Sequence, residues 1–345
     1  MEVKYSQNNV YRAIKSNADK NNRLFQVQVD ITHRCNAHCN FCFQGESHIS
    51  KEKELTIDEY SVLFKQLKEC GVLFLAISGG EPFCRMDVLD ILEMAKRMGF
   101  LVTFISNLQL ATTRDVFRLS SIGINRITIS VHSVNSSKYG KIFGVESKYF
   151  DEVISKIELL KAQKNSVGIA VTVTKDNIDE LPLIKRFFIE KGFLERDIGF
   201  NMPLEGRSSV INLRPSLDEI ERTFKDKSLR DNVLTELKGS NLCTAGRIFC
   251  VIDPYGNVAP CPFMDYTIGN IHKDDIRIIW MNSPYIRMIR DINQQWNFKK
   301  CNECNNNKTC HICMANNINE TGHFNIPSDD YCNFRKKLSE RFGIS

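Results

Sequence analysis

The sequence predicts an α/β fold built on a parallel sheet, followed by a smaller cysteine-rich domain. From residue 25 to about residue 205, short apolar runs alternate with amphipathic helical stretches, and eight of the 13 cysteines fall after residue 242. Strands that alternate with helices favour a parallel sheet with right-handed crossovers. The 345 residues exceed the usual size of one domain, so we expect one large domain and one small domain.

Six apolar runs are the predicted strands. They are Phe25–Ile31, Phe74–Ser78, Leu101–Ile105, Arg126–Val131, Val167–Val173 and Asp197–Phe200. The first intervening helix is predicted to begin at Thr56-Ile-Asp-Glu59, which matches a capping box. Further helices are expected at Asp87–Met98, Thr113–Ser121, Phe150–Gln163 and Asp179–Lys191. Six strand–helix units are too few for the eight-stranded barrel, and ligands are expected at the carboxyl ends of the strands.

Composition excludes several classes of protein. The hydrophobic content of 42%, the charged content of 25% and a net charge of +5 describe an ordinary soluble globular protein, not one with a nucleic-acid-binding surface. The N-terminus lacks the apolar core of a signal peptide, and no apolar run is long enough to span a membrane. We therefore expect a cytoplasmic protein. In that compartment many cysteines favour metal ligation over disulfides.

A cysteine triplet follows the first predicted strand. Cys35, Cys39 and Cys42 form a C-x3-C-x2-C pattern that can wrap one loop around a metal cluster. Three thiolates on a four-iron cluster leave one iron open to a small molecule. A zinc loop or a chance grouping is the alternative. His33 and His38 flank the triplet and are expected to surround the site without ligating the metal.

The second predicted strand ends in Ser78-Gly-Gly-Glu-Pro82, abbreviated GGEP. Glycines at the end of a strand let a ligand approach the backbone closely, although a simple turn is the alternative. Two cysteines near this strand have no assigned role. Cys70 falls on the apolar face of its predicted helix, and Cys84 lies just beyond the motif; both are expected to be structural.

The triplet and the GGEP motif together resemble the radical S-adenosylmethionine (radical SAM) superfamily, in which C-x3-C-x-aromatic-C follows the first strand. Phe41 fills the aromatic position. The resemblance implies a partial (β/α)6 TIM-like barrel and a [4Fe–4S] cluster on Cys35, Cys39 and Cys42. It also implies that SAM chelates the open iron and is reductively cleaved to a 5′-deoxyadenosyl radical, with electrons from a flavodoxin- or ferredoxin-type donor.

Further SAM contacts are implied residue by residue. The matching positions are Phe41, Gly79, Gly80, Glu81, Ser106, Asn107 and Ser130. Glu81 and the two glycines would face the amino group of SAM, and the strand-end serines and Asn107 would face its ribose and carboxylate. His132 stands where many relatives carry Asp, and Ser106-Asn-Leu replaces the commoner Thr-Asn-Gly. Asn201 and Pro203-Leu-Glu-Gly-Arg207 resemble a motif near the adenine.

The C-terminal cysteines form a second constellation. They read Cys243-x6-Cys250-x10-Cys261, then Cys301-x2-Cys304-x5-Cys310-x2-Cys313, then Cys332. Eight thiolates match two four-coordinate sites, and two zinc sites are the alternative. The pattern resembles the SPASM domain, except that two residues instead of three separate Cys310 from Cys313.

The SPASM resemblance implies two auxiliary [4Fe–4S] clusters, and so three clusters in total. Cys243, Cys250, Cys261 and Cys313 would hold the first, and Cys301, Cys304, Cys310 and Cys332 would hold the second. Cys250 stands in an apolar context, Ile-Phe-Cys-Val-Ile. If it is a core thiol instead, the first auxiliary cluster has an open iron. The expected domains are an N-terminal extension (1–24), the barrel (25–205), a helical bridge (206–240), the SPASM domain (241–336) and a tail (337–345).

Auxiliary clusters can accept an electron from the substrate after a hydrogen atom has been abstracted from it. This favours an oxidative reaction over a redox-neutral one. Most SPASM enzymes act on peptides, so the leading hypothesis is a peptide maturase of the RiPP (ribosomally made, modified peptide) type that cross-links or dehydrogenates a side chain. Pro262 argues against sulfatase maturation, in which an Asp holds that position; Asp265 and Tyr266 are candidate acid or base groups.

Two alternative functions remain, and it is open whether a separate protein binds a leader peptide. The first alternative acts on a small molecule or tetrapyrrole, like the haem-pathway decarboxylases; the second is a non-catalytic, zinc-stabilised binding module. Only 24 residues precede the first predicted strand, too few for a leader-binding domain. A separate protein would then bind a leader peptide, if the substrate has one.

Overall fold

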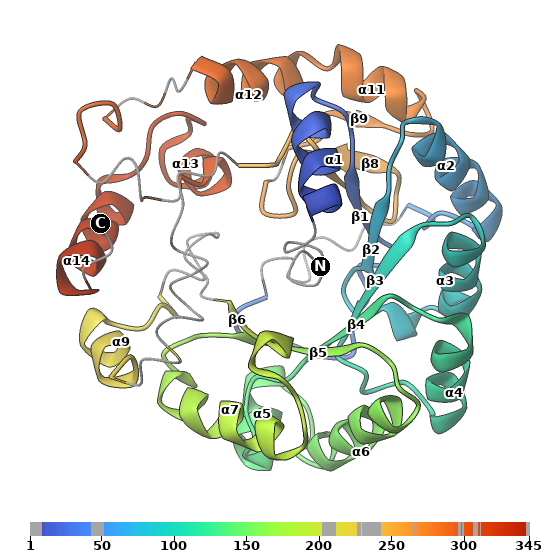
Figure 1. Ribbon diagram of the computed structural model, residues 1–345, viewed down its shortest axis with the longest axis vertical. Helices are drawn as coiled ribbons and strands as arrows, with labels where there is room; N and C mark the ends of the chain where they lie inside the picture. The colour runs from blue at the N-terminus through green and yellow to red at the C-terminus, as the bar shows by residue number, and fades with distance from the viewer. Residues whose placement is uncertain are drawn as a thin grey trace.

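The computed structural model describes residues 9–42, 52–201, 212–225, 229, 243–264, 266–295, 298, 300–305, 310 and 312–342. The strands lie inside a ring of helices (Figure 1). One nine-stranded sheet has the order β6-β5-β4-β3-β2-β1-β7-β8-β9; β6 through β7 pair in parallel, and β8 and β9 are antiparallel. The α/β class and the parallel barrel-like sheet are confirmed.

The elements follow the predicted pattern closely. The strands are β1 (Gln26–Asp30), β2 (Phe74–Ser78), β3 (Leu101–Ser106), β4 (Arg126–Ser130), β5 (Val167–Thr172), β6 (Ile198–Asn201), β7 (Phe249–Ile252), β8 (Asn257–Ala259) and β9 (Gly269–Asn270). The helices are α1 (Asn9–Lys20), α2 (Ile57–Glu69), α3 (Val88–Arg97), α4 (Thr113–Ile122), α5 (Ser136–Phe143), α6 (Tyr149–Ala162), α7 (Leu181–Glu190), α9 (Leu217–Thr223), α11 (Ile276–Asn282), α12 (Pro284–Gln295), α13 (Met314–Thr321) and α14 (Asp329–Phe342). Short 3-10 turns are η3 (Pro82–Cys84), η4 (Ile178–Glu180) and η5 (Glu195–Asp197). The six predicted strands and the predicted helices that connect them agree with these bounds within two residues.

The predicted capping box shows how local sequence starts a helix. The Thr56 side chain accepts a hydrogen bond from the Glu59 backbone N–H at 3.3 Å, and Glu59 Oε2 accepts one from the Thr56 backbone N–H at 2.7 Å. These bonds satisfy backbone N–H groups that have no partner inside the helix. Tyr60, Leu63 and Leu67 then recur on one face of α2 and are buried against the sheet.

A seventh parallel strand, β7, was not predicted. It pairs with β1, placing Cys250 opposite Val27 and Ile252 opposite Val29. The sheet therefore runs across the expected boundary between the barrel and the SPASM domain. At the other end of the chain, α14 runs to Phe342 and so crosses the expected start of the tail.

Helix α1 closes one end of the sheet. Its Tyr11 and Ala18 are buried against Phe25, Phe74 and Ile248, which lie where β1, β2 and β7 begin. The expected N-terminal extension thus contains a helix that covers the amino ends of three strands. The loop that contains Cys35, Cys39 and Cys42 lies at the opposite edge of the sheet, where β1 ends.

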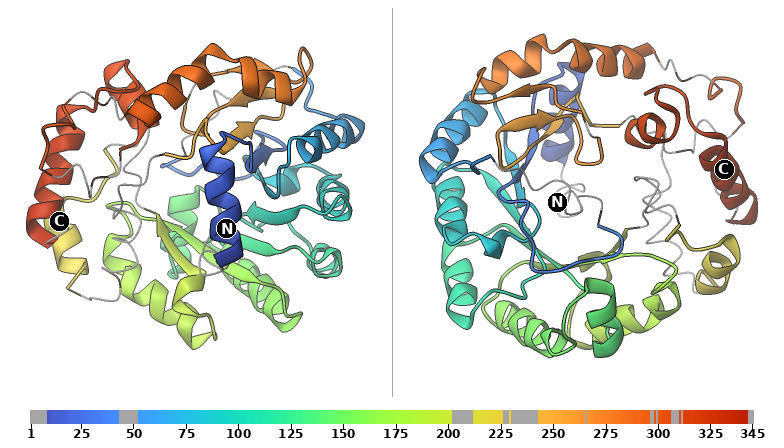
Figure 2. Two further views of the ribbon diagram at one scale, coloured as in Figure 1. Left: turned by 45° about the horizontal axis from the view of Figure 1, so that its top comes forward. Right: turned by 180° about the vertical axis from the view of Figure 1, so that it is seen from behind.

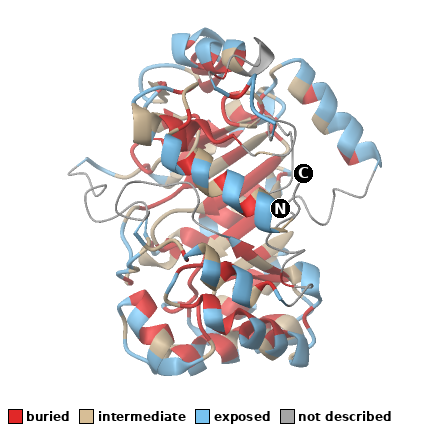
Figure 3. Ribbon diagram, turned by 90° about the vertical axis from the view of Figure 1, so that its left-hand side faces the viewer, coloured by how far each residue is buried: buried red, intermediate tan, exposed pale blue. Residues whose placement is uncertain are grey.

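The main core lies between the sheet and its outer helices, where Figure 3 shows buried residues along the strands. Helix α5, which was not predicted, follows β4 and packs against α6. Within the expected helical bridge, only 212–225 and Leu229 are described, and they contain α9. In the part of the chain that the structure describes, no helix is long and apolar enough to cross a membrane.

Candidate functional site

Residues 31–42, called the cluster loop below, leave β1 at the carboxyl edge of the sheet. The loop first continues the pairing of β1 with β2 through backbone hydrogen bonds. Ile31 N donates to Ser78 O at 2.9 Å, Gly80 N to Thr32 O at 2.8 Å, and Glu81 N to Arg34 O at 2.9 Å. The GGEP motif and the segment just before Cys35 are therefore fixed to each other.

The two glycines of GGEP make this close contact possible. Gly79 has φ +140°, and a Cβ atom there would lie 2.2 Å from Thr32 O. At Gly80 a Cβ atom would lie 2.5 Å from Arg34 O and 2.7 Å from His33 O. These distances are far below van der Waals contact, so both positions require glycine. The cluster loop thus explains the glycines; their contact with SAM remains a prediction.

A chain of side-chain amides ties the loop to the end of β3. Asn36 Nδ2 donates to Gln109 Oε1 at 2.6 Å, and Asn107 Nδ2 donates to Asn36 Oδ1 at 3.0 Å. Gln109 Nε2 continues the chain to the Tyr139 hydroxyl on α5 at 3.0 Å. Asn107 was predicted as a site residue, whereas Asn36 and Gln109 were not. Sequence gives no signal for such pairs, because their partners lie about 70 positions away.

The loop then crosses to the far side of the barrel opening, where Figure 2 shows the blue segment reaching the green elements. His38 N donates to Phe143 O at the end of α5 at 2.7 Å, and Asn40 Nδ2 donates to Asp176 Oδ2 at 2.9 Å. The Phe41 ring lies edge-on to His132, with ring centroids 4.7 Å apart. The aromatic position of the triplet therefore contacts the residue that follows β4.

The three thiols of the triplet lie close together. Cys35 and Cys42 are exposed and Cys39 is half-buried. Desolvation raises the pKa of Cys35 to about 11, and the negative charges of Glu81, Cys84 and Cys42 add to this. Burial raises the pKa of Cys39, and Cys42 and Cys35 raise it further. Three neighbouring thiols with an open side fit a cluster that takes three thiolates, because a metal holds such groups deprotonated.

Cys84 lies closer to this site than expected for a structural thiol. It ends η3, it raises the pKa of Cys35, and its own pKa is raised chiefly by burial and then by Glu81. Cys70, in contrast, lies at the end of α2 and packs against the main core. The expectation of a structural role therefore fits Cys70 better than Cys84.

Glu81 is fully buried and joins the ends of β2 and β3. Its carboxylate accepts hydrogen bonds from Phe83 N at 3.0 Å, Ser106 Oγ at 2.7 Å and Asn107 N at 2.7 Å. Burial raises the pKa of Glu81 to about 7, although these three bonds oppose the rise. Ser106 Oγ also accepts from Leu108 N at 2.8 Å. Two predicted SAM contacts, Glu81 and Ser106, thus bond to each other, and their contact with SAM remains a prediction.

On the far side, the end of β4 is also fixed by buried polar groups. Burial lowers the pKa of His132 to about 3, and its Nδ1 accepts from Thr172 N at 3.0 Å. The imidazole is therefore neutral, with its proton on Nε2. Ser130 is half-buried as the last residue of β4, and Asn201 is exposed at the end of β6. The segment Pro203–Arg207 lies outside the described residues.

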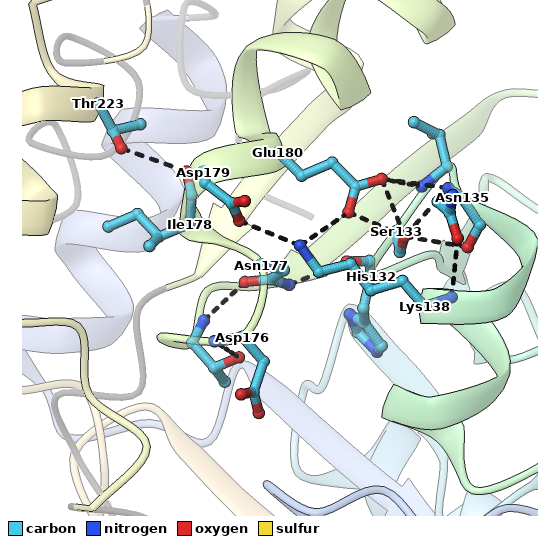
Figure 4. Close-up of polar contacts among 12 residues, drawn as sticks. His132, Ser133, Asn135, Lys138, Asp176, Asn177, Ile178, Asp179, Glu180 and Thr223 are labelled. Carbon is cyan, nitrogen blue, oxygen red and sulfur yellow. Dashed lines mark hydrogen bonds and ion pairs between the residues drawn. The ribbon is translucent and has the colours of Figure 1, made fainter.

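A buried carboxylate holds the turn that follows His132 (Figure 4). Glu180 accepts from Ser133 Oγ, Val134 N and Asn135 N at 2.9, 2.9 and 3.1 Å. Lys138 Nζ lies 3.4 Å from its other oxygen. The sequence analysis missed Glu180, because it looks like an ordinary acidic residue in the first turn of an amphipathic helix.

Two C-terminal cysteines, Cys301 and Cys332, have pKa values that burial and neighbouring thiols raise. Burial raises the pKa of Cys301 to about 12, with further contributions from Cys332, Cys310 and Cys304. Cys310 and Cys304 likewise raise the pKa of Cys332. These four are the set implied for the second auxiliary cluster. Among the described residues, no three His, Cys, Asp or Glu side chains are arranged to hold a single metal ion.

Three other cysteines surround a small apolar cluster, here called the C-terminal core. Its buried members are Met264, Ile289, Phe298, Cys301, Ile312, Cys313, Met314, Ala315 and Phe324, and Cys243 and Cys261 pack against it. Cys313 also begins α13, where its Sγ accepts from Asn316 N at 3.4 Å. Cys243, Cys261 and Cys313 are thus in one region, together with Cys301, and the assignment of the first three to the first auxiliary cluster stays a prediction.

Cys250, the predicted fourth ligand of that cluster, lies in a different apolar core from Cys243, Cys261 and Cys313, and its ligation stays a prediction. Cys250 is fully buried on β7 in the main core, and the thiol that raises its pKa, beyond the effect of burial, is Cys70. The apolar run Phe249–Ile252 forms a strand with β1, whereas Cys243 and Cys261 pack against the C-terminal core. Its apolar sequence context was the signal for this outcome.

The candidate acid and base groups receive little support. Asp265 lies outside the described residues. The Tyr266 ring packs edge-on against Tyr285 and Phe324, at 4.3 and 5.9 Å between centroids. Burial raises the pKa of Tyr266 to about 12, so it is protonated near neutral pH.

Comparisons with known proteins agree with this arrangement. A model of the radical SAM superfamily matches residues 29–188, and a model of the SPASM iron–sulfur cluster-binding domain matches residues 243–314. SAM and [4Fe–4S] clusters are therefore the cofactors of this chain.

Individual relatives differ in their activities. The AdoMet-dependent heme synthase of Methanosarcina barkeri is 25% identical over 337 residues, covering 89% of this chain and 95% of that protein. The mycofactocin maturase MftC of Mycolicibacterium smegmatis is 25% identical over 307 residues, covering 83% and 77%. Streptococcus suis SuiB bound to precursor peptide SuiA has a similar fold, with a TM-score of 0.72 and 20% identity, covering 94% and 80%.

Proposed function

This chain is a radical SAM enzyme with a C-terminal SPASM domain, and from that premise we propose that it oxidatively modifies a side chain of a peptide or protein, by cross-linking or dehydrogenation. The observation that carries the proposal is the second set of mutually close cysteines, Cys301, Cys304, Cys310 and Cys332. A redox-neutral reaction needs no second electron acceptor, whereas removal of two hydrogens does.

The electron count explains why a second cluster matters. When bound at Cys35, Cys39 and Cys42, the cluster and SAM supply a radical that removes one hydrogen atom from the substrate. The substrate radical must then lose one electron and one proton to reach an oxidised product. The C-terminal cysteines would hold the acceptor of that electron, giving three clusters in total. The first auxiliary cluster, with only Cys243, Cys261 and Cys313, would have an open iron.

The residues of the chain would position SAM at the carboxyl edge of the sheet. The resemblance implies that Phe41, Gly79, Gly80, Glu81, Ser106, Asn107 and Ser130 would contact SAM there. The cluster loop is fixed on both sides of the opening, by Asn36 and by Asn40. Neutral His132, packed against Phe41, would keep charge away from the reacting radical.

The proposed partners follow from the reaction. A peptide substrate is supported by the similar fold of SuiB, which was solved bound to its precursor peptide SuiA. Reduction of the first cluster would require a flavodoxin- or ferredoxin-type donor, and a separate protein would bind a leader peptide. This chemistry suits the reducing cytoplasm.

A second candidate is modification of a tetrapyrrole or other small molecule. It is supported by the Methanosarcina barkeri heme synthase, 95% of whose length this chain covers. The two candidates differ in product. Both reactions begin with abstraction of a hydrogen atom and give up one electron; peptide oxidation then also loses a proton, whereas a propionate side chain loses carbon dioxide and becomes a vinyl group.

Anaerobic turnover separates the candidates. The reconstituted enzyme, with SAM and a strong reductant, is incubated with peptides encoded beside its gene or with a porphyrin that carries propionates, and products are read by mass spectrometry. We expect a peptide product lighter by two hydrogen atoms. Loss of carbon dioxide from the porphyrin, with no change in any peptide, would contradict the proposal.

A single substitution tests the electron acceptor. Cys332→Ala should still produce 5′-deoxyadenosine, because the cluster loop does not involve Cys332, but oxidised product should be lost. The ratio of 5′-deoxyadenosine to product, compared with wild type, measures this. A normal ratio would show that the second auxiliary site is not needed for the reaction.

A further inference from the structure

One side chain in the C-terminal domain is buried without a partner. Asn316, on α13, has no exposed surface, and neither its Nδ2 nor its Oδ1 has a hydrogen-bond partner among the described residues. A buried amide that makes no hydrogen bond costs about 1–3 kcal/mol. The Asn316 Nδ2 group would therefore be stabilised by a hydrogen-bond acceptor that is not part of the polypeptide.

The position of Asn316 on α13 indicates where that acceptor lies. Cys313, Asn316 and Asn319 are three residues apart, so they share one side of the helix. At one end of this side, the Cys313 thiol accepts from Asn316 N at 3.4 Å. At the other end, Asn319 Nδ2 donates to Phe263 O at 3.1 Å. Helix α13 therefore contacts Phe263, two residues after Cys261, and begins at Cys313.

The next residue provides an internal contrast. Asn317 is equally buried, but its Nδ2 donates to Phe324 O at 2.8 Å. Two neighbouring asparagines thus have the same side chain and the same burial, and only one has its N–H groups satisfied by protein. Asn316 and Asn317 follow Cys313 by three and four residues, so both lie near it on α13, and the difference is that only the Asn317 Nδ2 has an acceptor in the protein.

We propose that Asn316 Nδ2 donates a hydrogen bond to a sulfur of the auxiliary cluster held by Cys243, Cys261 and Cys313, and that this bond raises the reduction potential of the cluster. The inference rests on the presence of this cluster and not on the identity of the substrate. A reduced cluster carries one more negative charge, so a donor to its sulfur stabilises the reduced form more than the oxidised form. The amino end of α13, at Cys313, acts in the same direction.

The consequence is that Asn316 is a positioning and tuning residue for electron acceptance. Without its N–H group the cluster would accept an electron less readily. The amide would act on the redox step alone, because Asn316 is on α13, whereas the cluster loop is held by β2, β3, α5 and Asp176. A change at this residue should therefore leave cleavage of SAM unaffected.

The test is a redox titration followed by electron paramagnetic resonance. Cys35, Cys39 and Cys42 are first changed to Ala, so that only the auxiliary clusters remain, and the signal lost in Cys261→Ala is assigned to the cluster in question. In that background, Asn316→Leu removes the donor at similar volume, Asn316→Asp replaces it with a negative charge, and Asn317→Leu is the matched control. Iron and sulfide content are measured for each.

The expected result is a lower potential for Asn316→Leu, by about tenfold in the reduction equilibrium or about 59 mV for one electron. Asn316→Asp should lower it further. Asn317→Leu should lower the melting temperature without moving the potential. An unchanged potential in both Asn316 variants, or an equal shift in Asn317→Leu, would overturn the proposal. It would also be overturned if neither Asn316 variant bound the cluster while Asn317→Leu did.

Failure of this inference and failure of the proposed function are distinguishable. If substitution of Asn316 does not change the reduction potential, the hydrogen-bond proposal fails and the proposal of peptide oxidation still stands. Conversely, a tetrapyrrole product would revise the substrate and leave the hydrogen bond standing.

Discussion

The cluster loop and the C-terminal cysteine region both bring thiols together, but the polypeptide does so in different ways. The cluster loop is fixed by backbone bonds to β2 and by amides to β3 and to Asp176. Its thiols Cys35 and Cys42 are exposed. In the C-terminal region Cys301 and Cys313 are buried in a small apolar core beside an unpartnered amide.

The difference teaches which site needs its metal to be formed. A loop with all these contacts keeps its geometry when empty and leaves an open side for a second ligand. A small core whose buried polar groups have no protein partner gains part of its stability from the metal, as structural metal sites do. The cluster loop is therefore held by protein contacts and leaves room for a second ligand, whereas the C-terminal region depends on its metal for part of its stability.

The largest expected effect follows from removing the three thiols of the cluster loop. Changing Cys35, Cys39 and Cys42 together to Ala should abolish formation of 5′-deoxyadenosine, because no other site can present SAM with an open iron in the barrel. The protein should fold and keep the iron of its C-terminal domain. Chromatographic assay and iron analysis check both points; loss of all iron would contradict the separation of the two regions.

The next effect comes from the close contact between GGEP and the loop. Gly79→Ala places a Cβ atom 2.2 Å from Thr32 O at φ +140°, so the loop must move. We expect a loss of about 3 kcal/mol in unfolding free energy, from strain and overpacking together. SAM cleavage should fall about 100-fold, as misplacement of a reacting group by about 1 Å does.

Gly71 provides the control for Gly79, because it has φ +81° but no atom within 4 Å of a Cβ. Gly71→Ala should cost about 1 kcal/mol from backbone strain and leave SAM cleavage unchanged. Equal effects of the two substitutions on cleavage would show that the contact between the glycines and the loop is unimportant.

A smaller effect is expected from pH, through Glu81. Its folded pKa of about 7 is raised above the ordinary value of 4.5, so the stability it contributes is full below pH 4.5 and is lost as pH rises through 7. The shift corresponds to about 3 kcal/mol. Measured on metal-free protein, the unfolding free energy of Glu81→Gln minus that of wild type should rise from pH 4.5 to above 7. A constant difference would contradict the burial argument.

The smallest effect on metal content is expected at Cys250. Because it lies in the main core, Cys250→Ala should keep the full iron content and lose about 1 kcal/mol of stability through a small cavity. Cys243→Ala is the control and should lose iron from the first auxiliary site. Equal loss of iron in the two variants would show that Cys250 is a ligand of the first auxiliary cluster.

The sequence predicted the barrel well because each of its six strands is an apolar run bounded by helix signals. It did not predict β7, because four residues, Phe249–Ile252, carry too little periodicity and their cysteine matched a ligand pattern. Helix α5 was also missed, since Gly140 within it weakens the helical signal.

The site was predictable to the extent that its residues form local patterns. The triplet and GGEP are contiguous motifs, so their residues could be named from sequence. Asn36, Gln109 and Glu180 act through partners 30 or more positions away, and no local pattern marks them. Asn316 is recognisable only from its burial.

Hydrogen exchange with and without metal tests the contrast between the two regions most directly. The iron-loaded protein and the same protein after anaerobic chelation are compared by mass spectrometry. Removal of metal should accelerate exchange in α13 and around Cys301, and leave β1 to β6 unchanged. Strand β7 should behave like the barrel, although it lies in the C-terminal part of the sequence. Unchanged exchange in α13, or equal acceleration in both regions, would contradict the account.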